Sequence, residues 1–338
     1  MGCGTTSLRS PLIKLSAVGA AVISLTVNGT AEAALESAPI VVSRNTQEVA
    51  ARSVEVNGIN IFYREAGRPT LPAIVLLHGF PSSSFAFRDL IPRLSSHFHV
   101  LAPDYPGYGY SDAPTPDKYE YTFDHVARTI DQFLGKVGLS HYILYMHDYG
   151  GPVGFRIATA HPERIDGLVI QNANAYEVGL SPQWKQELED DIKNAAHHRS
   201  RPQHSAHPLE SNLKWIQPMY TTGARDPSTM TRDGYTFDAA MLARPGQDLI
   251  QDTIGDNYYT NVLLYPQWEA WLRKNQPRTL VLWGKGDPIF NAEGAKAYRR
   301  DVPNARLVFF DGGHFLLEEY AAEIAGQIID MFAVTPAR

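Results

Sequence analysis

Patterns typical of buried strands and of amphipathic helices alternate along most of this chain. Several short, largely apolar runs are typical of strands that are covered on both faces of a sheet. These runs occupy residues 73–77, 100–102, 142–146, 167–170, 279–283 and 306–310. Between them, apolar residues recur at helical spacing over 87–94, 122–137, 150–160, 292–300 and 315–332. We therefore predict an α/β fold with a mostly parallel, doubly wound sheet.

Two stretches depart from this rhythm. Apolar and polar residues alternate over 54–63 around Asn57-Gly58, which predicts a β-hairpin with a two-residue turn. Between residues 176 and 275 the strand patterns disappear, and helical periodicity is seen over 184–196. Because the strands then resume, we predict a core of residues 51–175 and 276–338 that carries residues 176–275 as an inserted helical cap.

The N-terminal segment has the layout of a secretory signal. Arg9 and Lys14 precede a small, apolar run over 15–27, and Ala31-Glu32-Ala33 offers a small-residue cleavage site. The apolar run is too short to span a membrane. Cleavage after Ala33 would remove Cys3, the only cysteine, so we expect neither an intrachain disulfide nor thiol chemistry.

We predict a signal peptide over residues 1–33, a linker over 34–50 and a secreted or periplasmic protein. Two alternatives stay open: myristoylation at Gly2, or an unstructured extension of a cytoplasmic protein. The chain has 338 residues and a net charge of −6, with no run rich in Lys or Arg, which argues against a nucleic-acid partner.

The junction after the apolar run 142–146 carries the first candidate for chemistry. The run stops at His147-Asp148, and Gly150, Gly151 and Pro152 follow before a helical pattern begins. A strand, a turn, two glycines and a proline in the first helical turn predict a strand-to-helix elbow. Such an elbow presents a nucleophile, which is usually serine. Here the residue in that position is Asp148.

Asp287 and His314 stand just after two later predicted strands. The carboxyl ends of parallel strands meet at one edge of a sheet, where ligands bind. Asp148, Asp287 and His314 therefore predict a nucleophile, an acid and a histidine in the chain order of α/β-hydrolases. Resemblance to these hydrolases implies an alternative place for the acid, after the strand that follows the elbow helix. Asn172 occupies that place, but an amide cannot stabilise an imidazolium as a carboxylate does.

Several short motifs agree with this prediction. They are His78-Gly-Phe-Pro81, His147-Asp-Tyr-Gly-Gly151, Gly284-Lys-Gly-Asp287 and Gly313-His314. From residue 54 to the C-terminus the chain resembles the α/β-hydrolase superfamily, in the branch of epoxide hydrolases and haloalkane and haloacid dehalogenases. One departure is Met146, where the family has a small residue, and it predicts a looser or tilted elbow.

The resemblance implies an aspartate nucleophile, a helical cap, and a His-Gly-x-Pro turn with a cis proline that shapes the oxyanion hole. The backbone N–H groups of Phe80 and Tyr149 would hold the oxyanion. We also expect His78, Pro81 and His147 to contact the substrate. The implied enzyme needs no cofactor.

An aspartate nucleophile changes the expected chemistry. It displaces a leaving group from a saturated carbon and forms an alkyl-enzyme ester. Water activated by His314 then attacks the carbonyl of Asp148, while Asp287 orients the imidazole. No Gly-x-Ser-x-Gly motif occurs, which weakens an esterase interpretation.

The leaving group separates the candidate activities. By resemblance, haloalkane dehalogenases place Trp after the nucleophile, often with Asn in the His-Gly-x-Pro turn, and fluoroacetate dehalogenases place Arg after the nucleophile. This chain has Tyr149 and Phe80 there. Epoxide hydrolases use cap tyrosines as proton donors, and we favour Tyr258, then Tyr259, with Tyr220 a weaker choice for the second tyrosine.

We predict an epoxide hydrolase acting on small hydrophobic epoxides. Dehalogenation with the same triad and a non-catalytic binding protein on a hydrolase scaffold are the alternatives, and the oligomeric state stays open. Two other signals are set aside. The loose cluster of His197, His198, His204 and His207 lacks the spacing of a metal site, and Gly107-Tyr-Gly109 lacks the context of a phosphate loop.

Overall fold

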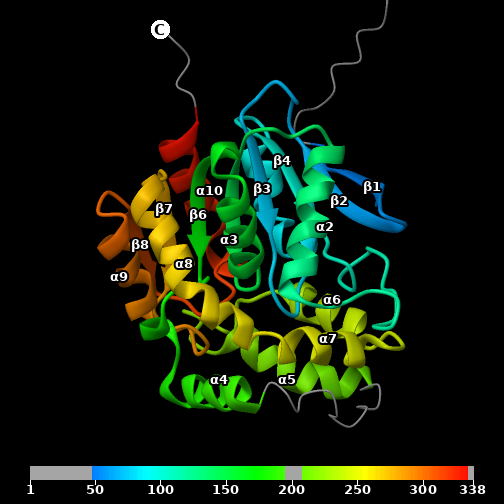
Figure 1. Ribbon diagram of the computed structural model, residues 1–338. Helices are drawn as coiled ribbons and strands as arrows, with labels where there is room; N and C mark the ends of the chain where they lie inside the picture. Colours follow the sequence, from blue (N-terminus) through cyan, green and yellow to red (C-terminus); the bar gives the residue numbers. More distant parts are fainter. Residues whose placement is uncertain (1–47, 195–207, 334–338) are drawn as a thin grey trace, which may run out of the picture. The chain divides into compact units, whose positions relative to one another are not determined.

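A computed structural model describes residues 48–194 and 208–333 of the chain (Figure 1). The predicted signal peptide, its cleavage site and the histidine cluster lie outside these residues. The strands are β1 (Ala50–Val56), β2 (Ile59–Ala66), β3 (Ala73–Leu77), β4 (His99–Pro103), β5 (Tyr142–His147), β6 (Ile165–Gln171), β7 (Thr279–Gly284) and β8 (Arg306–Phe310). They form one sheet in the order β1-β2-β4-β3-β5-β6-β7-β8.

The sheet is parallel from β4 to β8, and β2 pairs antiparallel with both β1 and β4. This arrangement confirms the predicted α/β fold. The predicted hairpin joins β1 and β2, with Asn57 and Gly58 at φ values of 52° and 82°. These positive φ values are the backbone conformation that an Asn-Gly turn supplies at low cost.

Helices cover both faces of the sheet. In chain order, the helices of the described residues are α1 (Ile91–Leu94), α2 (Phe123–Lys136), α3 (Gly150–Ala160), α4 (Pro182–Asn194), α5 (Leu209–Thr221), α6 (Asp233–Leu242), α7 (Gln247–Asp256), α8 (Tyr259–Asn275), α9 (Ala292–Asp301) and α10 (Leu317–Phe332). Short 3₁₀ turns span Ser84–Phe87, Pro162–Arg164 and Glu177–Gly179. Helices α2, α3, α8 and α9 pack on one face, and α1 and α10 on the other.

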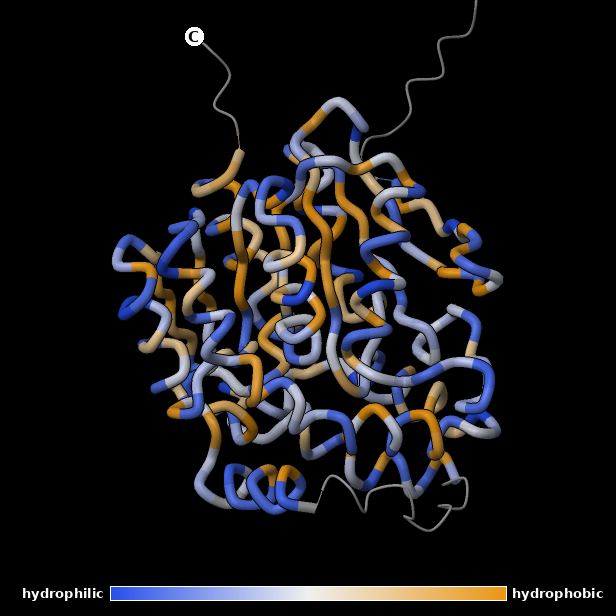
Figure 2. The backbone as a smooth tube through the Cα atoms, viewed as in Figure 1, coloured by the Kyte–Doolittle hydropathy of each residue, from blue (hydrophilic) through white to orange (hydrophobic). Residues whose placement is uncertain are grey.

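Alternate strand residues point into the two resulting core layers. Val75 and Leu77 belong to the layer with α2 and α3, whereas Ile74 and Leu76 belong to the layer with α10. Figure 2 shows the hydrophobic residues concentrated along the central strands. Burial on both faces explains why these strands read as uninterrupted apolar runs in the sequence.

The predicted helix over 87–94 is wrong in its extent. The chain forms a 3₁₀ turn at Ser84–Phe87 and then the short helix α1. Ser83 caps the first of these, since its side chain accepts from the N–H of Phe85, and Pro92 lies in the first turn of the second. Phe87, Leu90, Ile91 and Leu94 are all fully buried. The spacing of these residues therefore indicates which side chains face the core. It does not show that one continuous helix carries them.

Helices α4–α8 lie between β6 and β7, in the region predicted as an insertion. Trp215 of α5 stacks on Phe80, which follows β3, and Tyr258 packs near Tyr149, which follows β5. The inserted helices thus contact the loops at the carboxyl ends of the strands. Helix α8 also reaches the core, where its Trp268 stacks on Phe155 of α3. In the described ranges, no helix has the length and apolar character needed to cross a membrane.

Candidate active site

The elbow after β5 holds Asp148 in a left-handed backbone conformation, with φ of 51°. Strand β5 is buried throughout and ends at His147, and α3 begins at Gly150. A Cβ atom on Gly150 would lie 2.2 Å from the carbonyl oxygen of Leu77, so the start of the helix needs a glycine to approach β3. The turn leaves the Asp148 side chain 5% exposed at the end of the strand.

Met146 does not disturb the elbow in the way that we predicted. Its pairing with β3 and β6 is regular, and the ladder with β6 continues to His147. A Cβ atom on Gly154 would lie 2.3 Å from the sulfur of Met146. The larger side chain in the strand is therefore accommodated by the absence of a side chain in the helix.

The two oxygens of the Asp148 carboxylate have different surroundings. Oδ1 accepts a hydrogen bond from the backbone N–H of Phe80 at 2.7 Å, and the N–H of Tyr149 also donates to the carboxylate. Oδ2 lies 3.7 Å from Nε2 of His314. Burial raises the pKa of Asp148, and the nearby His314 and the two N–H donors oppose that rise. The bond from Phe80 to Pro81 is cis, as the resemblance implied.

Asp287 and His314 meet as the sequence predicted. Nδ1 of His314 donates to Oδ2 of Asp287 at 3.0 Å, so Nε2 is the nitrogen that faces Asp148. Nε2 has no hydrogen-bond partner among the described residues. Burial lowers the pKa of His314, but the carboxylates of Asp287 and Asp148 outweigh burial and leave that pKa raised.

Asn172 supports this pair, a role that sequence reasoning missed. Its side-chain amide donates to Oδ2 of Asp287 at 2.6 Å, and its own Oδ1 accepts from the N–H of Gly284 at 3.2 Å. The N–H groups of Ile289 and Phe290 donate to the other oxygen of Asp287. The signal was present in the sequence, because Asn172 occupies the alternative place for the acid.

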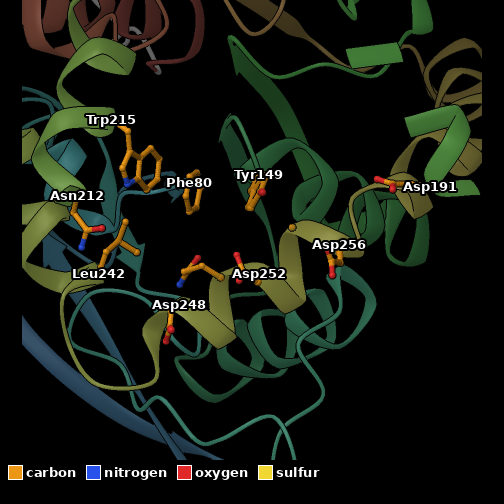
Figure 3. Close-up of a pocket in the computed structure, with 11 residues that line it drawn as sticks. Phe80, Tyr149, Asp191, Asn212, Trp215, Leu242, Asp248, Asp252 and Asp256 are labelled. Atoms are coloured by element: carbon orange, nitrogen blue, oxygen red, sulfur yellow. The ribbon is translucent and has the colours of Figure 1, made fainter. Parts of the chain in front are cut away.

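A pocket of about 420 Å³ lies between the nucleophile elbow loops and the inserted helices (Figure 3). Phe80 and Tyr149 line it, and these are the residues whose N–H groups bind the Asp148 carboxylate. The rest of its lining comes from α4, α5, α6 and α7. The pocket therefore joins the inserted helices to the nucleophile elbow.

Comparisons with known proteins identify the family of the chain. Residues 72–321 match the model of the alpha/beta hydrolase fold family. The chain belongs to the α/β-hydrolase family. An uncharacterized hydrolase of Saccharomyces cerevisiae is 40% identical to it over 279 residues, which are 82% of this α/β-hydrolase and 94% of that protein.

Two further relatives of this α/β-hydrolase have named activities. Haloalkane dehalogenase 2 of Mycobacterium bovis is 38% identical over 112 residues, which are 33% of this chain and 38% of that protein. Epoxide hydrolase 3 of Mus musculus is 26% identical over 295 residues, which are 82% of this chain and 75% of that protein.

Two histidines of the α/β-hydrolase motifs are held by backbone groups. Nε2 of His147 donates to the carbonyl oxygen of His314 at 3.2 Å, and burial lowers the pKa of His147 well below its usual value. In His78, Nδ1 donates to Gly79 and Nε2 accepts from Tyr105, each at 3.1 Å, and burial lowers its pKa to about 3. Both imidazoles are neutral and buried, which suits positioning better than the predicted contact with substrate.

The predicted cap tyrosines lie in different places. Tyr258 is 3% exposed, packs against Tyr149, and has its pKa raised well above the usual value by burial, with Tyr265 and Asp148 adding to the effect. Tyr259 is half-buried against the core. The structure does not bring Tyr220 to the nucleophile. Its hydroxyl donates to Asp238 at 2.5 Å, and its ring stacks on Phe315.

Tyr105 and Tyr108 are tyrosines that sequence reasoning missed. They follow β4, and burial, aided by the charge of Asp148, raises the pKa of each well above its usual value. Their hydroxyls are buried and have no hydrogen-bond partner within the described ranges. The signal was their place beside Gly107 and Gly109, just after a predicted strand, which sequence reasoning considered only as a possible phosphate loop.

Proposed function

We propose that this α/β-hydrolase is an epoxide hydrolase with Asp148 as its nucleophile. The observation that carries the proposal is that the two oxygens of the Asp148 carboxylate have different contacts. Oδ1 is bound by a backbone N–H at 2.7 Å, while Oδ2 faces the unpartnered Nε2 of His314 at 3.7 Å. The oxygen near His314 is thus the one that can attack a carbon atom in the pocket.

In the first step, Oδ2 of Asp148 forms a bond to a ring carbon, and the carbon–oxygen bond of the epoxide breaks. The departing oxygen takes a proton from a phenol, for which we propose Tyr258. Its hydroxyl is protonated at neutral pH, it has no hydrogen-bond partner among the described residues, and Asp148 influences its pKa. The products of this step are an alkyl ester on Asp148 and a tyrosinate, which is reprotonated from water.

In the second step, Nε2 of His314 takes a proton from water, and the hydroxide attacks the Asp148 carbonyl carbon. The N–H groups of Phe80 and Tyr149 stabilise the negative charge that develops on Oδ1. The carboxylate of Asp287, 3.0 Å from Nδ1, stabilises the imidazolium. Collapse of the tetrahedral intermediate releases a diol and restores Asp148.

A dehalogenase with the same triad is the second candidate, and the haloalkane dehalogenase relative supports it. A halide leaves as an anion, needs N–H donors such as an indole or an amide, and takes no proton. Phe80 contributes no side-chain donor, whereas the phenols of Tyr105, Tyr108 and Tyr258 lie near enough to Asp148 for its charge to raise the pKa of each. Because an alkoxide needs the proton that a phenol supplies, these groups favour an epoxide.

A single turnover in water labelled with heavy oxygen tests the covalent route. We expect mass spectrometry to find the label in the peptide that contains Asp148, and His314→Gln to accumulate the alkyl ester on that peptide. Turnover without label in Asp148 would reject the aspartyl ester. Matched assays on epoxides and haloalkanes, with halide release followed, separate the two activities. A protein that binds these compounds and turns over none of them would instead be a binding protein.

A further inference from the structure

Helix α7 turns a polar face toward the pocket. Its lining residues recur at the spacing of one helix face, and they are Asp248, Gln251, Asp252, Gly255 and Asp256. Ile250 and Ile254, on the opposite face, are buried in the core. Figure 3 shows Asp248, Asp252 and Asp256 along this helix, across the pocket from Phe80 and Tyr149.

The wall formed by α7 is negative. Asp191 of α4 adds a fourth carboxylate, and the part of the lining that the structure describes contains no Lys, Arg or His. Asp191, Asp252 and Asp256 also interact with other groups of the chain. The argument therefore depends first on Asp248, which forms no hydrogen bond or ion pair with the described residues. A carboxylate at a pocket wall attracts cations and repels carboxylates.

Gln251 adds a neutral acceptor to the same wall. Its Nε2 donates to the carbonyl of Gly107 at 3.3 Å and to Oε1 of Gln247 at 3.2 Å. Its own Oε1 is buried and has no donor among the described residues, although the side chain lines the pocket and is only 8% exposed. This buried amide anchors the middle of α7 to the loop at Gly107, and it therefore fixes the position of the carboxylates on either side of it.

Aromatic faces form the opposite side of the pocket. The rings of Trp215 and Phe80 stack, with centroids 5.7 Å apart and planes 13° apart, and Tyr149 lies 5.9 Å from Phe80. The indole of Trp215 is 40% exposed where it lines the pocket. Aromatic faces attract cations through their quadrupole. Carboxylates on one side and aromatic faces on the other are the two features that bind an ammonium group.

We propose that the substrate of this enzyme carries an ammonium group, which binds between α7 and Trp215 while the reactive carbon lies at Asp148. This inference rests on the proposed function and narrows its substrate class. The sequence predicted a small hydrophobic epoxide, and the pocket indicates an epoxide that carries a positive charge. The ammonium group lies beside Asp248, with its alkyl groups against Trp215. The same wall disfavours substrates that carry a carboxylate.

Glycidyltrimethylammonium and its neutral isostere, neopentyloxirane, test the proposal because they differ in charge and hardly in shape. We expect kcat/KM to be about tenfold higher for the cation, and Asp248→Asn to lower that ratio about threefold, as expected for part-exposed charges. Asp248→Asn combined with Asp252→Asn should bring the ratio close to one. Both variants should lower kcat/KM more for the cation than for the neutral substrate. A wild-type ratio of one or below, or a ratio that neither variant changes, would overturn the proposal.

Asp166→Asn is the matched control, since Asp166 is an exposed carboxylate at the amino end of β6, away from the pocket. It should leave the ratio unchanged. Failure of the proposed function is distinguishable, because then neither epoxide is turned over. In that case the ammonium site is still tested by calorimetry, in which benzyltrimethylammonium is titrated into the Asp148→Asn variant. We expect binding that Asp248→Asn weakens about threefold. Absence of binding would reject the site.

Discussion

Asn172 and His314 donate hydrogen bonds to the same oxygen of Asp287, at 2.6 and 3.0 Å. Asn172 itself is fixed by Gly284, which donates to its Oδ1. Asp287 is therefore held by Asn172, which follows β6, and by the N–H groups of Ile289 and Phe290 in its own loop. The amide fixes the carboxylate that orients the imidazole, so it controls the geometry of the proposed base without touching the substrate.

Asn172→Ala should lower kcat about tenfold to a hundredfold, since a hydrogen bond to a charged group contributes about 1.5–3 kcal/mol. Asn172→Asp should instead move the acid limb of the kcat profile to higher pH. That limb reports the protonation of His314, whose pKa is already raised by Asp287, and a second carboxylate raises it further. Both pH profiles and melting curves would be measured. An unmoved acid limb in the folded Asn172→Asp variant would contradict the role assigned to this position.

Tyr258→Phe should slow formation of the alkyl ester about a hundredfold or more, because the departing alkoxide loses its proton donor. Rapid-quench mass spectrometry measures this step directly. Tyr220→Phe is the matched control, since its hydroxyl is engaged by Asp238 and its ring packs on Phe315. If Tyr258→Phe forms the ester at the wild-type rate while Tyr105→Phe or Tyr108→Phe does not, the donor lies in the loop after β4.

The sequence was sufficient for the order of strands and helices because burial on both faces leaves an unmistakable apolar run. It was insufficient to predict the backbone of residues 87–94, where buried side chains recur at helical spacing but do not belong to one continuous helix. Phe87, Leu90, Ile91 and Leu94 are all buried. The backbone nevertheless forms a 3₁₀ turn that Ser83 caps, breaks after Phe87, and begins the separate helix α1 at Ile91. Hydrophobic spacing reports burial, and backbone hydrogen bonding is a separate matter.

At the site, the meeting of Asp148, Asp287 and His314 was predictable, since each follows a parallel strand and all reach one edge. The partners of Asp287 were not, because Asn172 could be judged only as an acid until its contacts were known. The tyrosines divide in the same way. The sequence favoured Tyr258 over Tyr220, and packing shows why they differ: Asp148 influences the first, and Asp238 binds the second.

Asp148→Asn should raise the melting temperature at neutral pH while it abolishes turnover. Burial raises the folded-state pKa of Asp148 above its unfolded value, so the folded protein binds this proton more tightly. As pH rises from about 4, the unfolded chain loses the proton first, and the ionised carboxylate then costs stability. The gain should therefore shrink as the pH is lowered toward 4 in calorimetric scans. A variant that melts below the wild type at pH 7 would show that the carboxylate is stabilising.

Gly154→Ala should destabilise the protein by about 1–3 kcal/mol, because its Cβ would lie 2.3 Å from the sulfur of the fully buried Met146. Met146→Ala alone should also destabilise it, by about 2–5 kcal/mol, since it leaves a cavity in the core. The methyl group of the first change enters the space that the second vacates. The double variant should consequently be more stable than the sum of the single effects predicts, and denaturant unfolding measures this coupling. Additive losses would mean that Met146 is accommodated by some other movement, and the pairing of strand and helix at the elbow would need a different explanation.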